Sequence, residues 1–536
     1  MKKTKAVFII LLISTLPVLS QRRAQTQEER DYVQKLVTAY QAITSLYVDK
    51  TNDTKIVEDA LTGILEKLDP HSSYTNAEET RKMNEPLEGN FDGIGIQFNM
   101  LTDTLYVIQV ISGGPSEKVG ILPGDRMIYV DDSLIAGVKM PSTDVMKKLR
   151  GKKGTEVTVQ IKRSNNPELL KFKIIRDKIP VYSLDASYMA DKQTGYIRLS
   201  RFAASTPDEF RKALEELKKQ GMKNLILDLQ DNGGGYLNIA YDLADEFLDK
   251  EKLVVYTKGN AQPRQDAVST SKGMFETGKL VIMVNETSAS ASEILAGAVQ
   301  DWDRGVIVGR RTFGKGLVQR PIMLPDTSMI RLTVARYYTP SGRNIQKPYE
   351  SGNIEAYNHD LIDRFNHGEL MSADSIHFPD SLKYTTLVSH RTVYGGGGIM
   401  PDIFIPIDTT RSTDYHSKLG RYGIIYKTAM NYIDSHRKEM NTKYSDFKKF
   451  NEKFEITEGM LGTMKQMAAD EKIEYNEEQF NQSKALISLQ IKAYMARDLF
   501  DTSEFFQTVN GESDTYRKAL EIINDDGLYR KILSEE

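Results

Sequence analysis

The chain has 536 residues, which is more than one domain usually needs, so two to four domains are expected. Hydrophobic residues make up 40% of the sequence and charged residues 27%, near the globular average, which excludes disorder and fibrous folds for most of the chain. The net charge of −3 gives no basic field and argues against a nucleic-acid partner. The sequence has no cysteine, which excludes disulfides, thiolate metal sites and a cysteine nucleophile, and none of its seven histidines lies in an HExxH pattern. No metal and no cofactor is therefore expected.

The beginning of the chain has the pattern of a secretory signal peptide. Lys2, Lys3 and Lys5 precede a mostly apolar run from Ala6 to Leu19, and the small residue Ser20 follows. The run is shorter than the roughly 20 apolar residues that a membrane span needs, and an uncleaved N-terminal anchor is the alternative. No second long apolar run occurs in the sequence. We therefore expect an exported protein without an integral membrane span, located in the periplasm of a bacterium.

The next two regions are predicted to be helical and then β-rich. Between Tyr32 and Leu65, apolar residues recur at three- and four-residue steps, and Pro70 ends the second helix. From Leu87 to Arg176 the pattern alternates, as in strands. The expected strands are residues 93–98, 105–110 and 155–163, and short helices are expected at 116–119 and 142–149.

From Ile179 to about Asp402, predicted strands and helices alternate, which is typical of a layered α/β core. A polar insertion at residues 347–390 interrupts this pattern, and beyond Asp408 the sequence is helical to the end. The predicted core strands are residues 195–199, 224–229, 253–256, 280–284, 305–308, 317–324 and 329–337, and the predicted core helices are residues 207–220, 239–247 and 291–303.

A serine cluster, residues 288–292, lies where a predicted buried strand gives way to a helix. A hydroxyl at a helix start lies beside free N–H groups, which stabilise developing negative charge, but ordinary helix capping by serine explains the same pattern. Lys315, in a glycine-bounded turn between two apolar strands, favours a catalytic site, because a lysine kept from water loses proton affinity and can act as a general base. Ser–Lys pairs are an alternative to Ser–His–Asp, and no histidine lies within 65 residues of the cluster.

Two other motifs compete with this interpretation. Residues 309–315 match GxxxxGK, the start of a phosphate-binding loop, but Gly316 stands where Ser or Thr should hold magnesium. A strand, and not the required helix, is predicted to follow. Ser-x-x-Lys also occurs at residues 269–272, 435–438 and 445–448, always in polar contexts and without its companion motifs. Both motifs therefore have less support than the Ser–Lys pair.

Two glycine-containing segments offer backbone N–H groups. Residues 233–235 are three glycines that follow a predicted strand, and they suit either an oxyanion pocket or a tight turn, or both. The Gly-Ile-Gly-Ile segment at residues 93–96 can bind the terminal carboxylate of a peptide that adds as a strand. An ordinary glycine-containing strand start explains this second segment equally well.

Together these segments resemble the carboxy-terminal processing (tail-specific) serine peptidases over roughly residues 30–405. Two motifs are similar to those of a PDZ domain, Gly-Ile-Gly-Ile at 93–96 and Gly-Ile-Leu-Pro-Gly-Asp at 120–125. The remaining matches are Asp-Pro-His-Ser-Ser-Tyr at 69–74, Ser-Ala-Ser-Ala-Ser-Glu at 288–293, Gln-Asp at 300–301, Thr-Phe-Gly-Lys-Gly-x-Val-Gln at 312–319, Tyr-Thr-Pro-Ser-Gly-Arg at 338–343 and Gly-Gly-Ile-Met-Pro-Asp at 397–402.

The resemblance implies a role for several residues. In this family the middle serine of the motif is the nucleophile and the lysine lies 25 positions later, which selects Ser290 and Lys315. The glutamine four positions after the lysine, Gln319, is thought to orient it. The remaining implied positions are Ala291 and Gly234 or Gly235, whose backbone N–H groups would hold the oxyanion, and Gly93, Ile94, Gly95 and Ile96, which would bind the peptide C-terminus.

The sequence departs from the family pattern at three places. Gln230 stands where the family often has Arg, and Gly233 where it often has Pro. The insertion at 347–390 separates segments that are usually close in sequence. The region past Asp408 matches no part that the resemblance assigns, although helical ends often mediate assembly in this family.

The predicted fold is multidomain α+β: N-terminal helices, a β-rich PDZ domain, an α/β (crotonase-like) serine peptidase core and a helical C-terminal region. The predicted function is that of an exported serine endopeptidase, a hydrolase that recognises and processes protein C-terminal tails with a Ser–Lys dyad. A non-catalytic PDZ scaffold that binds C-termini is the alternative. Expected partners are protein or peptide substrates bound by their C-termini, an adaptor protein, and further copies of the chain bound through its terminal helices. The predicted boundaries are residues 1–20 for the signal peptide, 27–86 for the N-terminal helices, 87–176 for the PDZ domain, 177–407 for the peptidase core with its insertion at 347–390, and 408–536 for the C-terminal helices.

Overall fold

The structure is a computed structural model that describes residues 26–101, 103–163, 166–270 and 272–534. The predicted signal peptide at residues 1–20 lies outside these ranges. The chain divides into two compact units, one ending at Ile64 and one running from Leu65 onward. In the described part of the chain, none of the helices is both long and apolar enough to cross a membrane.

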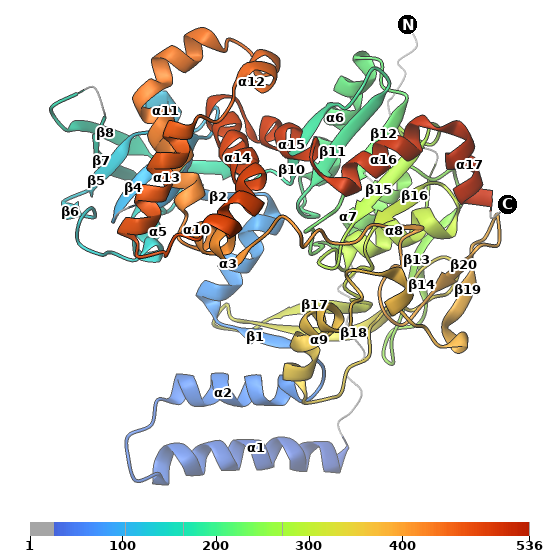
Figure 1. The fold of residues 1–536 in the computed structure, drawn as a ribbon. Coiled ribbons are helices and arrows are strands. Elements are labelled where there is room, and N and C mark those ends of the chain that lie inside the picture. Colours follow the sequence, from blue (N-terminus) through green and yellow to red (C-terminus); the bar gives the residue numbers. More distant parts are fainter. Residues whose placement is uncertain (1–25, 102, 164–165, 271, 535–536) are drawn as a thin grey trace, which may run out of the picture. The chain divides into compact units, whose positions relative to one another are not determined.

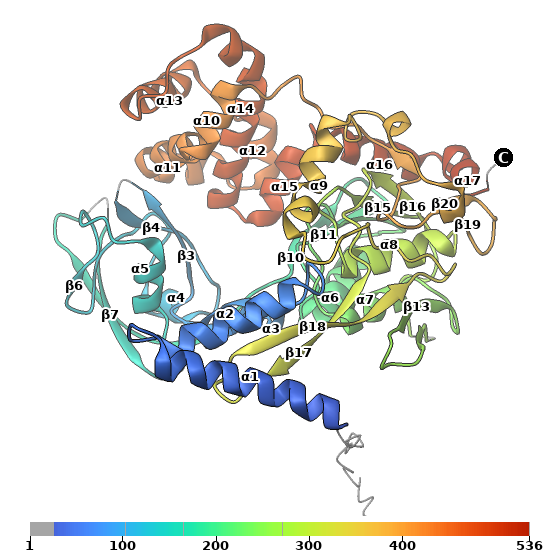
Figure 2. The ribbon, with the colours of Figure 1, turned by 90° about the horizontal axis from the view of Figure 1, so that it is seen from below.

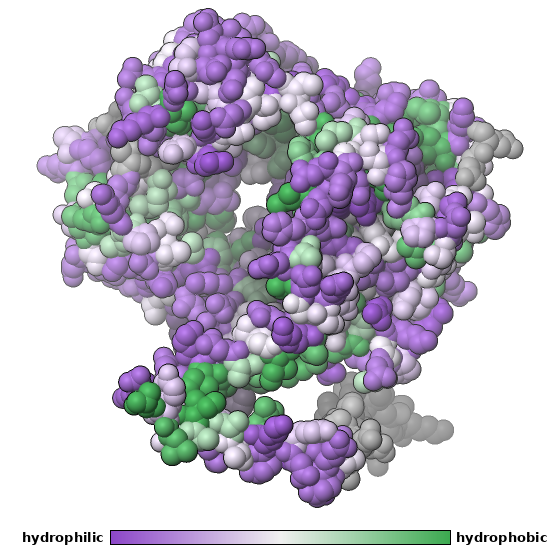
Figure 3. Space-filling model, turned by 60° about the horizontal axis from the view of Figure 1, so that its bottom comes forward, coloured by the Kyte–Doolittle hydropathy of each residue, from purple (hydrophilic) through white to green (hydrophobic). Residues whose placement is uncertain are grey.

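The first unit contains helix α1 (Gln27–Leu46) and most of helix α2 (Asp53–Glu66) (Figure 1). A capping box begins α1: the Thr26 hydroxyl accepts from the amide of Glu29, and the Glu29 carboxylate accepts from the amide of Thr26. The apolar side chains from which the helix α1 was predicted are exposed. Hydrophobic residues accordingly gather on the surface of this unit in Figure 3. They are Tyr32, Val33, Leu36, Val37, Tyr40, Ile43 and Leu46.

The β-rich part of the second unit is a six-stranded antiparallel sheet in the order β3-β4-β5-β7-β8, with β6 paired to β5. Every second residue of β7 (Glu156–Lys162) is buried, as the two-residue period of a strand requires. Helix α5 (Ser142–Leu149) adds Val145 and Leu149 to the same core. The other elements are β3 (Ile96–Leu101), β4 (Thr104–Val110), α4 (Pro115–Val119), β5 (Arg126–Val130), β6 (Ser133–Leu134) and β8 (Leu170–Ile175).

The central sheet of the second unit has six strands in the order β10-β11-β12-β15-β16-β21. β10 is antiparallel to β11 and the other pairs are parallel; the helices α6, α7 and α8 lie in the crossovers that connect β11, β12, β15 and β16. β15 is apolar and buried at all of its positions, as expected for a strand covered on both faces. The bounds are β10 (Leu184–Met189), β11 (Thr194–Leu199), α6 (Thr206–Lys219), β12 (Asn224–Asp228), α7 (Leu237–Asp245), β15 (Leu280–Val284), α8 (Ala291–Asp301), β16 (Val306–Gly309) and β21 (Ile403–Phe404).

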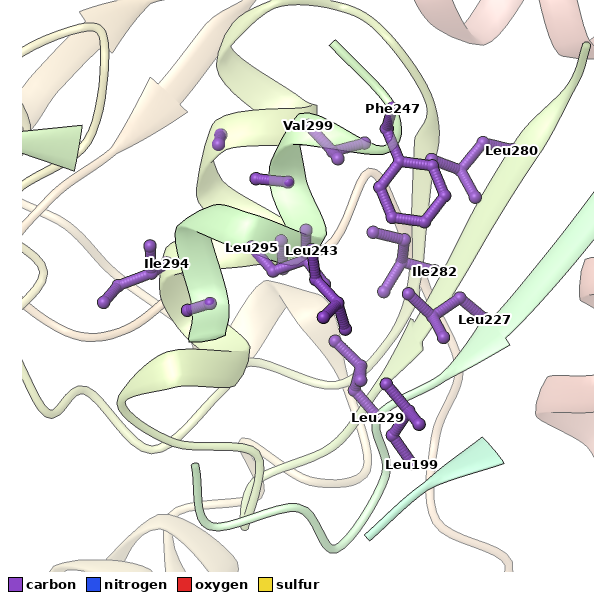
Figure 4. Close-up of a cluster of buried hydrophobic side chains, with 14 of the residues drawn as sticks. Leu199, Leu227, Leu229, Leu243, Phe247, Leu280, Ile282, Ile294, Leu295 and Val299 are labelled. Carbon is purple, nitrogen blue, oxygen red and sulfur yellow. The ribbon is translucent and has the colours of Figure 1, made fainter. Parts of the chain in front are cut away.

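Helices cover both faces of the central sheet. On one face, side chains of α7 and α8 such as Leu243 and Leu295 pack against β12 and β15 (Figure 4). On the other face lie the last two helices, α16 (Asp514–Asn524) and α17 (Asp526–Ser534), whose apolar side chains share a cluster with those of the sheet. The predicted division at residue 408 placed these two helices outside the core. The structure corrects this, since an amphipathic pattern shows that a helix has a buried face but not what covers it.

A second sheet has the order β1-β18-β13-β14, with β17 beside β18. Strand β1 (Ser73–Thr75) lies inside the region predicted to be helical and pairs with β18 (Met329–Tyr338). Helix α3 (Ala77–Glu88) runs two residues past the predicted end of the helical region at residue 86 and holds Pro86 within it. The other strands are β13 (Leu253–Lys258), β14 (Gln265–Val268) and β17 (Leu317–Met323).

The polar insertion is ordered by helix α9 (Ile354–Asn366) and strand β19 (Lys383–Thr385), which pairs with β20 (Thr392–Tyr394). Figure 2 draws the C-terminal helices α10 to α15 in orange and red, and side chains of α10 to α14 form an apolar cluster that includes Ile108 of β4. These helices are α10 (Asp414–Arg421), α11 (Ile424–Lys443), α12 (Phe447–Lys453), α13 (Glu458–Asp470), α14 (Glu477–Leu499) and α15 (Thr502–Asn510). Strand β2 (Asn90–Gly93) precedes the β-rich part in the chain and β9 (Asp177–Pro180) follows it, and these two strands pair with each other.

Tyr529→Phe is expected to destabilise the protein. The Tyr529 hydroxyl accepts from the amide of Leu280 at 3.0 Å and donates to its carbonyl at 3.1 Å. Because Leu280 is buried, loss of this partner costs about 1–3 kcal/mol of the free energy of unfolding. Urea denaturation followed by circular dichroism should show a lower midpoint, while Tyr422→Phe, at an exposed tyrosine, should leave it unchanged. Equal midpoints for the two variants would contradict a stabilising role for the α17 contact.

Candidate active site

Ser290 lies at the junction between the buried strand β15 and helix α8. Its backbone has φ 57° and ψ −111°, an uncommon conformation for a residue with a side chain. Its amide donates to the carboxylate of Glu293 at 2.8 Å, which fixes the turn. Strained backbone of this kind persists only where the surrounding structure holds it, and it clusters at functional sites.

The two flanking serines have structural partners. Ser288 is buried and donates to the carbonyl of Leu229 at 2.7 Å, and Ser292 is buried and donates to the carbonyl of Asn232 at 2.9 Å. Both hydroxyls therefore fasten the serine turn to the glycine segment that follows β12. Of the three serines, Ser290 is the one that lines the cavity described below.

Glu293 connects the serine turn with the lysine loop. Its carboxylate is fully buried and accepts from the Thr312 hydroxyl at 2.6 Å and from the amides of Gly314 and Lys315 at 2.7 and 2.9 Å. Burial raises the pKa of Glu293, and these hydrogen bonds act in the opposite direction by favouring the carboxylate. Glu293 was not among the predicted site residues, although Ser-x-x-Glu at a helix start is the pattern of a capping box.

The same hydrogen bonds exclude the nucleotide interpretation of this loop. The amides of Gly314 and Lys315 donate to Glu293 and are not open to a phosphate, and strand β17 follows the loop where a phosphate-binding motif requires a helix. Among the described residues, no cluster of three or more His, Asp or Glu side chains is placed to hold a metal ion.

Lys315 is held largely away from water. Burial, assisted by the nearby positive charge of Arg331, lowers the pKa of Lys315 to about 8, although Glu293 and Asp69 act in the opposite direction. An appreciable fraction of the side chain is therefore neutral near neutral pH. His71, another titratable group near this lysine, is a poor proton acceptor, since burial and then the charge of Lys315 lower its pKa to about 4.

A cavity of about 660 Å³ brings most of the predicted site residues together. Ser290, Lys315 and Gln319 all line it, and so do the glycines at 233–235. Apolar side chains complete much of the wall. These are Met83, Leu87, Leu237, Ile294, Leu317, Val318, Met323 and Met329.

Gln319 lines the cavity, but its side chain is hydrogen-bonded to Thr333 and not to the lysine. Its amide group donates to the Thr333 hydroxyl at 3.3 Å, and this hydroxyl donates to Asp69 at 2.9 Å. No hydrogen bond between Gln319 and Lys315 is present among the described residues. Asp69, within the Asp-Pro-His motif, therefore fixes the position of Gln319 through Thr333.

The glycine segment approaches the serine turn closely. A Cβ atom on Gly234, whose φ is 99°, would lie 2.8 Å from the carbonyl oxygen of Ala289 and 2.9 Å from the amide nitrogen of Ala291, so only glycine fits. The Gly234 amide donates to the side chain of Asn232 at 2.9 Å. The amides of Gly235 and Ala291, in contrast, donate no hydrogen bond to any described residue. Of the two glycines considered for the oxyanion pocket, Gly235 is thus the one with a free amide.

The insertion helix α9 supports the lysine loop from behind. Arg364 is buried and donates to the carbonyls of Thr312 and Arg311 at 3.1 and 2.7 Å. The amide of Lys347 donates to the carbonyl of Gly314 at 2.9 Å. Its ammonium group donates to the Tyr357 carbonyl and to the Asp360 carboxylate, both on α9. No role was predicted for the insertion, because a polar segment carries no signal in sequence of the distant segment that it contacts.

Arg364→Ala is expected to lower kcat more than it changes KM. The carbonyls to which Arg364 donates lie within four residues of Lys315, so loss of these hydrogen bonds loosens the lysine loop. A displacement of a catalytic group by about 1 Å can reduce turnover by roughly a hundredfold. Arg364→Lys should recover part of the rate, and His359→Ala, at an exposed position of the same helix, should have no effect. A steady-state assay that gave wild-type kcat for Arg364→Ala would show that α9 does not position the lysine.

A second cavity, of about 470 Å³, lies in the β-rich part between β3 and α5. Ile94, Gly95 and Ile96 line it, together with side chains of β3 and α5. Gly93 does not line this groove; it ends strand β2 and pairs with Asp177 on β9. Three of the four residues predicted to bind a peptide C-terminus thus line the groove, and Gly93 does not.

Comparison with known proteins matches four parts of the chain. Residues 193–355 match the peptidase family S41, residues 93–174 match the PDZ domain, and residues 13–80 match the N-terminal domain of the activating protease CtpB. Residues 415–501 match a family of unknown function.

Two relatives that match more than half of the chain are described as proteases. A probable CtpA-like serine protease of Staphylococcus epidermidis is 35% identical over 339 residues, which cover 63% of this chain and 68% of that protein. A carboxy-terminal-processing protease of Bartonella bacilliformis is 34% identical over 352 residues, covering 64% of this chain and 80% of that one. The solved photosystem II D1 C-terminal processing protease is 29% identical, with a TM-score of 0.32 and coverage of 57% and 88%. The resemblance drawn from the motifs is thus confirmed: the chain belongs to the carboxy-terminal processing serine proteases of peptidase family S41.

Proposed function

We propose that the chain is a serine endopeptidase that recognises and processes the C-terminal tails of proteins, with Ser290 as nucleophile and Lys315 as general base. The observation that carries this proposal is that both residues line one cavity, while Lys315 has a pKa of about 8. A serine hydroxyl needs a nearby base to become nucleophilic, and a lysine with a lowered pKa can serve near neutral pH.

The proposed reaction uses residues of this chain alone. Neutral Lys315 takes the proton of the Ser290 hydroxyl as its oxygen attacks the scissile carbonyl, and later returns that proton to the leaving amine. The amides of Ala291 and Gly235 stabilise the oxyanion, which is consistent with their lack of another acceptor. Gln319, fixed by Thr333, orients the lysine. Water then hydrolyses the acyl-enzyme by the same steps in reverse.

Tail recognition is assigned to the groove between β3 and α5. A peptide that adds as a strand beside β3 would place its terminal carboxylate at the amides of residues 94–96, and α5 would offer Met146 to its last side chain. The amides of Ile94 and Gly95 have no acceptor among the described residues, which supports this use. Export to the periplasm, an adaptor protein and assembly through the terminal helices belong to the same proposal, and the exposed apolar row on α1 supports the assembly.

Paired peptides test the proposal. Two peptides of identical sequence, one ending in a free acid and the other in an amide, should differ about ten- to a hundredfold in affinity, because amidation removes a charge-assisted hydrogen bond. Fluorescence anisotropy measures binding and mass spectrometry locates the cut. Binding of the acid peptide without any cleavage would favour the alternative of a non-catalytic scaffold, and equal treatment of both peptides would remove tail recognition from the proposal.

A further inference from the structure

The charges that line the catalytic cavity are all of one sign. Arg201, Lys315 and Arg331 face this space, and the residues that line it include neither aspartate nor glutamate. The proposed mechanism uses Lys315 and gives neither arginine a part. A cavity with unopposed positive charge favours a substrate segment that carries negative charge.

Arg331 lines the cavity without a charged partner among the described residues. It is half-buried on β18, where Pro321 of β17 and Ser73 of β1 are its cross-strand neighbours, and burial lowers its pKa. It forms neither a hydrogen bond nor an ion pair with any described side chain. Other arginines of the core are paired, as Arg198 is with Asp228 and Arg310 is with Glu286. A half-buried cation with no partner in the chain is available to pair with an anion that enters the cavity from outside.

We propose that Arg331 is a specificity-determining residue that binds a carboxylate of the substrate beside the scissile bond, with Arg201 as a second cation in the same cavity. The inference rests on the proposed function, since it names the substrate class of that site. The planar guanidinium offers two parallel N–H donors, which match a carboxylate in a bidentate pair. Apolar side chains that line the same cavity, such as Met329 and Leu317, would exclude water from a bound substrate and strengthen the pair. Two substrate groups have this chemistry, an acidic side chain and the terminal carboxylate of a short tail.

The test compares peptides that share one C-terminal tail, so that any contribution of the β3–α5 groove is constant. A parent peptide with Glu or Asp near the scissile bond is paired with its Gln or Asn counterpart, and kcat/KM is measured for both. Wild type should prefer the acidic peptide by about ten- to a hundredfold. A second pair, shortened so that the chain end lies near the scissile bond and ending in acid or amide, asks whether the terminal carboxylate is the group bound.

Arg331→Gln should reduce the acidic preference to near unity, and Arg331→Lys should keep part of it, because a point charge remains without the bidentate fork. The matched control is Arg320→Gln, which removes the same charge from an exposed position of β17 and should keep the wild-type preference. Loss of Arg331 also relieves its repulsion of Lys315, but this changes the rates of both peptides of a pair equally and leaves their ratio unchanged.

The outcomes separate the two proposals. An unchanged preference in Arg331→Gln, or a wild type that cuts acidic and amide peptides equally well, would overturn the inference while leaving the protease intact. If the wild type cut neither the peptides nor an unfolded protein, the proposed function itself would be contradicted, and the inference with it. Far-ultraviolet circular dichroism of each variant confirms that the comparison is made between folded proteins.

Discussion

Ser290→Ala is expected to abolish cleavage of an unfolded substrate such as casein, with a loss on the order of 10⁴-fold or more. The reason is the mechanism proposed above: without the hydroxyl there is no nucleophile for Lys315 to activate, and the remaining oxyanion donors give only weak catalysis. The variant should fold normally, because the turn is held by backbone hydrogen bonds of Ser290 to Glu293, which alanine keeps. Release of casein fragments and a thermal melt measure the two properties separately.

The neighbouring serines supply the controls for this prediction. Ser288→Ala and Ser292→Ala each remove a buried hydrogen bond to a backbone carbonyl, so each should lower the free energy of unfolding by about 1–3 kcal/mol. Both should retain cleavage, since neither hydroxyl lines the cavity. If Ser290→Ala cut casein at the wild-type rate, or if Ser288→Ala were the inactive variant, the nucleophile would have to be reassigned.

Local patterns in the sequence predicted the elements that hold the site. Strand β15 is a run of apolar residues and α8 begins at a serine with glutamate three positions later, so both followed from short-range pattern. The glycines after β12 were recognised for the same reason, and the structure places them against the serine turn. The family resemblance selected Ser290, Lys315 and Gln319 as catalytic residues. In the structure all three line one cavity.

Contacts between distant segments could not be predicted in this way. Arg364 reaches the lysine loop from the insertion, and Tyr529 reaches β15 from the end of the chain, although neither residue stands in a recognisable motif. Arg331 lies in a predicted strand and belongs to none of the motifs found in the sequence. What marks it is the absence of a carboxylate among the residues that line the cavity, and only the three-dimensional arrangement reveals this.

Lys315→Arg is expected to be nearly as inactive as Lys315→Ala, with kcat reduced on the order of 10²- to 10⁴-fold. Arginine keeps the positive charge but does not release a proton near neutral pH, so it cannot act as the base. In the wild type, kcat/KM should rise as the pH increases through about 8 and level off above it, because the neutral form of Lys315 is the active one. Arg331→Gln should move this rise to higher pH, since it removes a neighbouring charge that lowers the pKa of Lys315. A Lys315→Arg enzyme with near-normal turnover, or a wild-type rate that is flat between pH 6 and 10, would show that the positive charge alone is needed, and the general base would have to be sought elsewhere in the cavity.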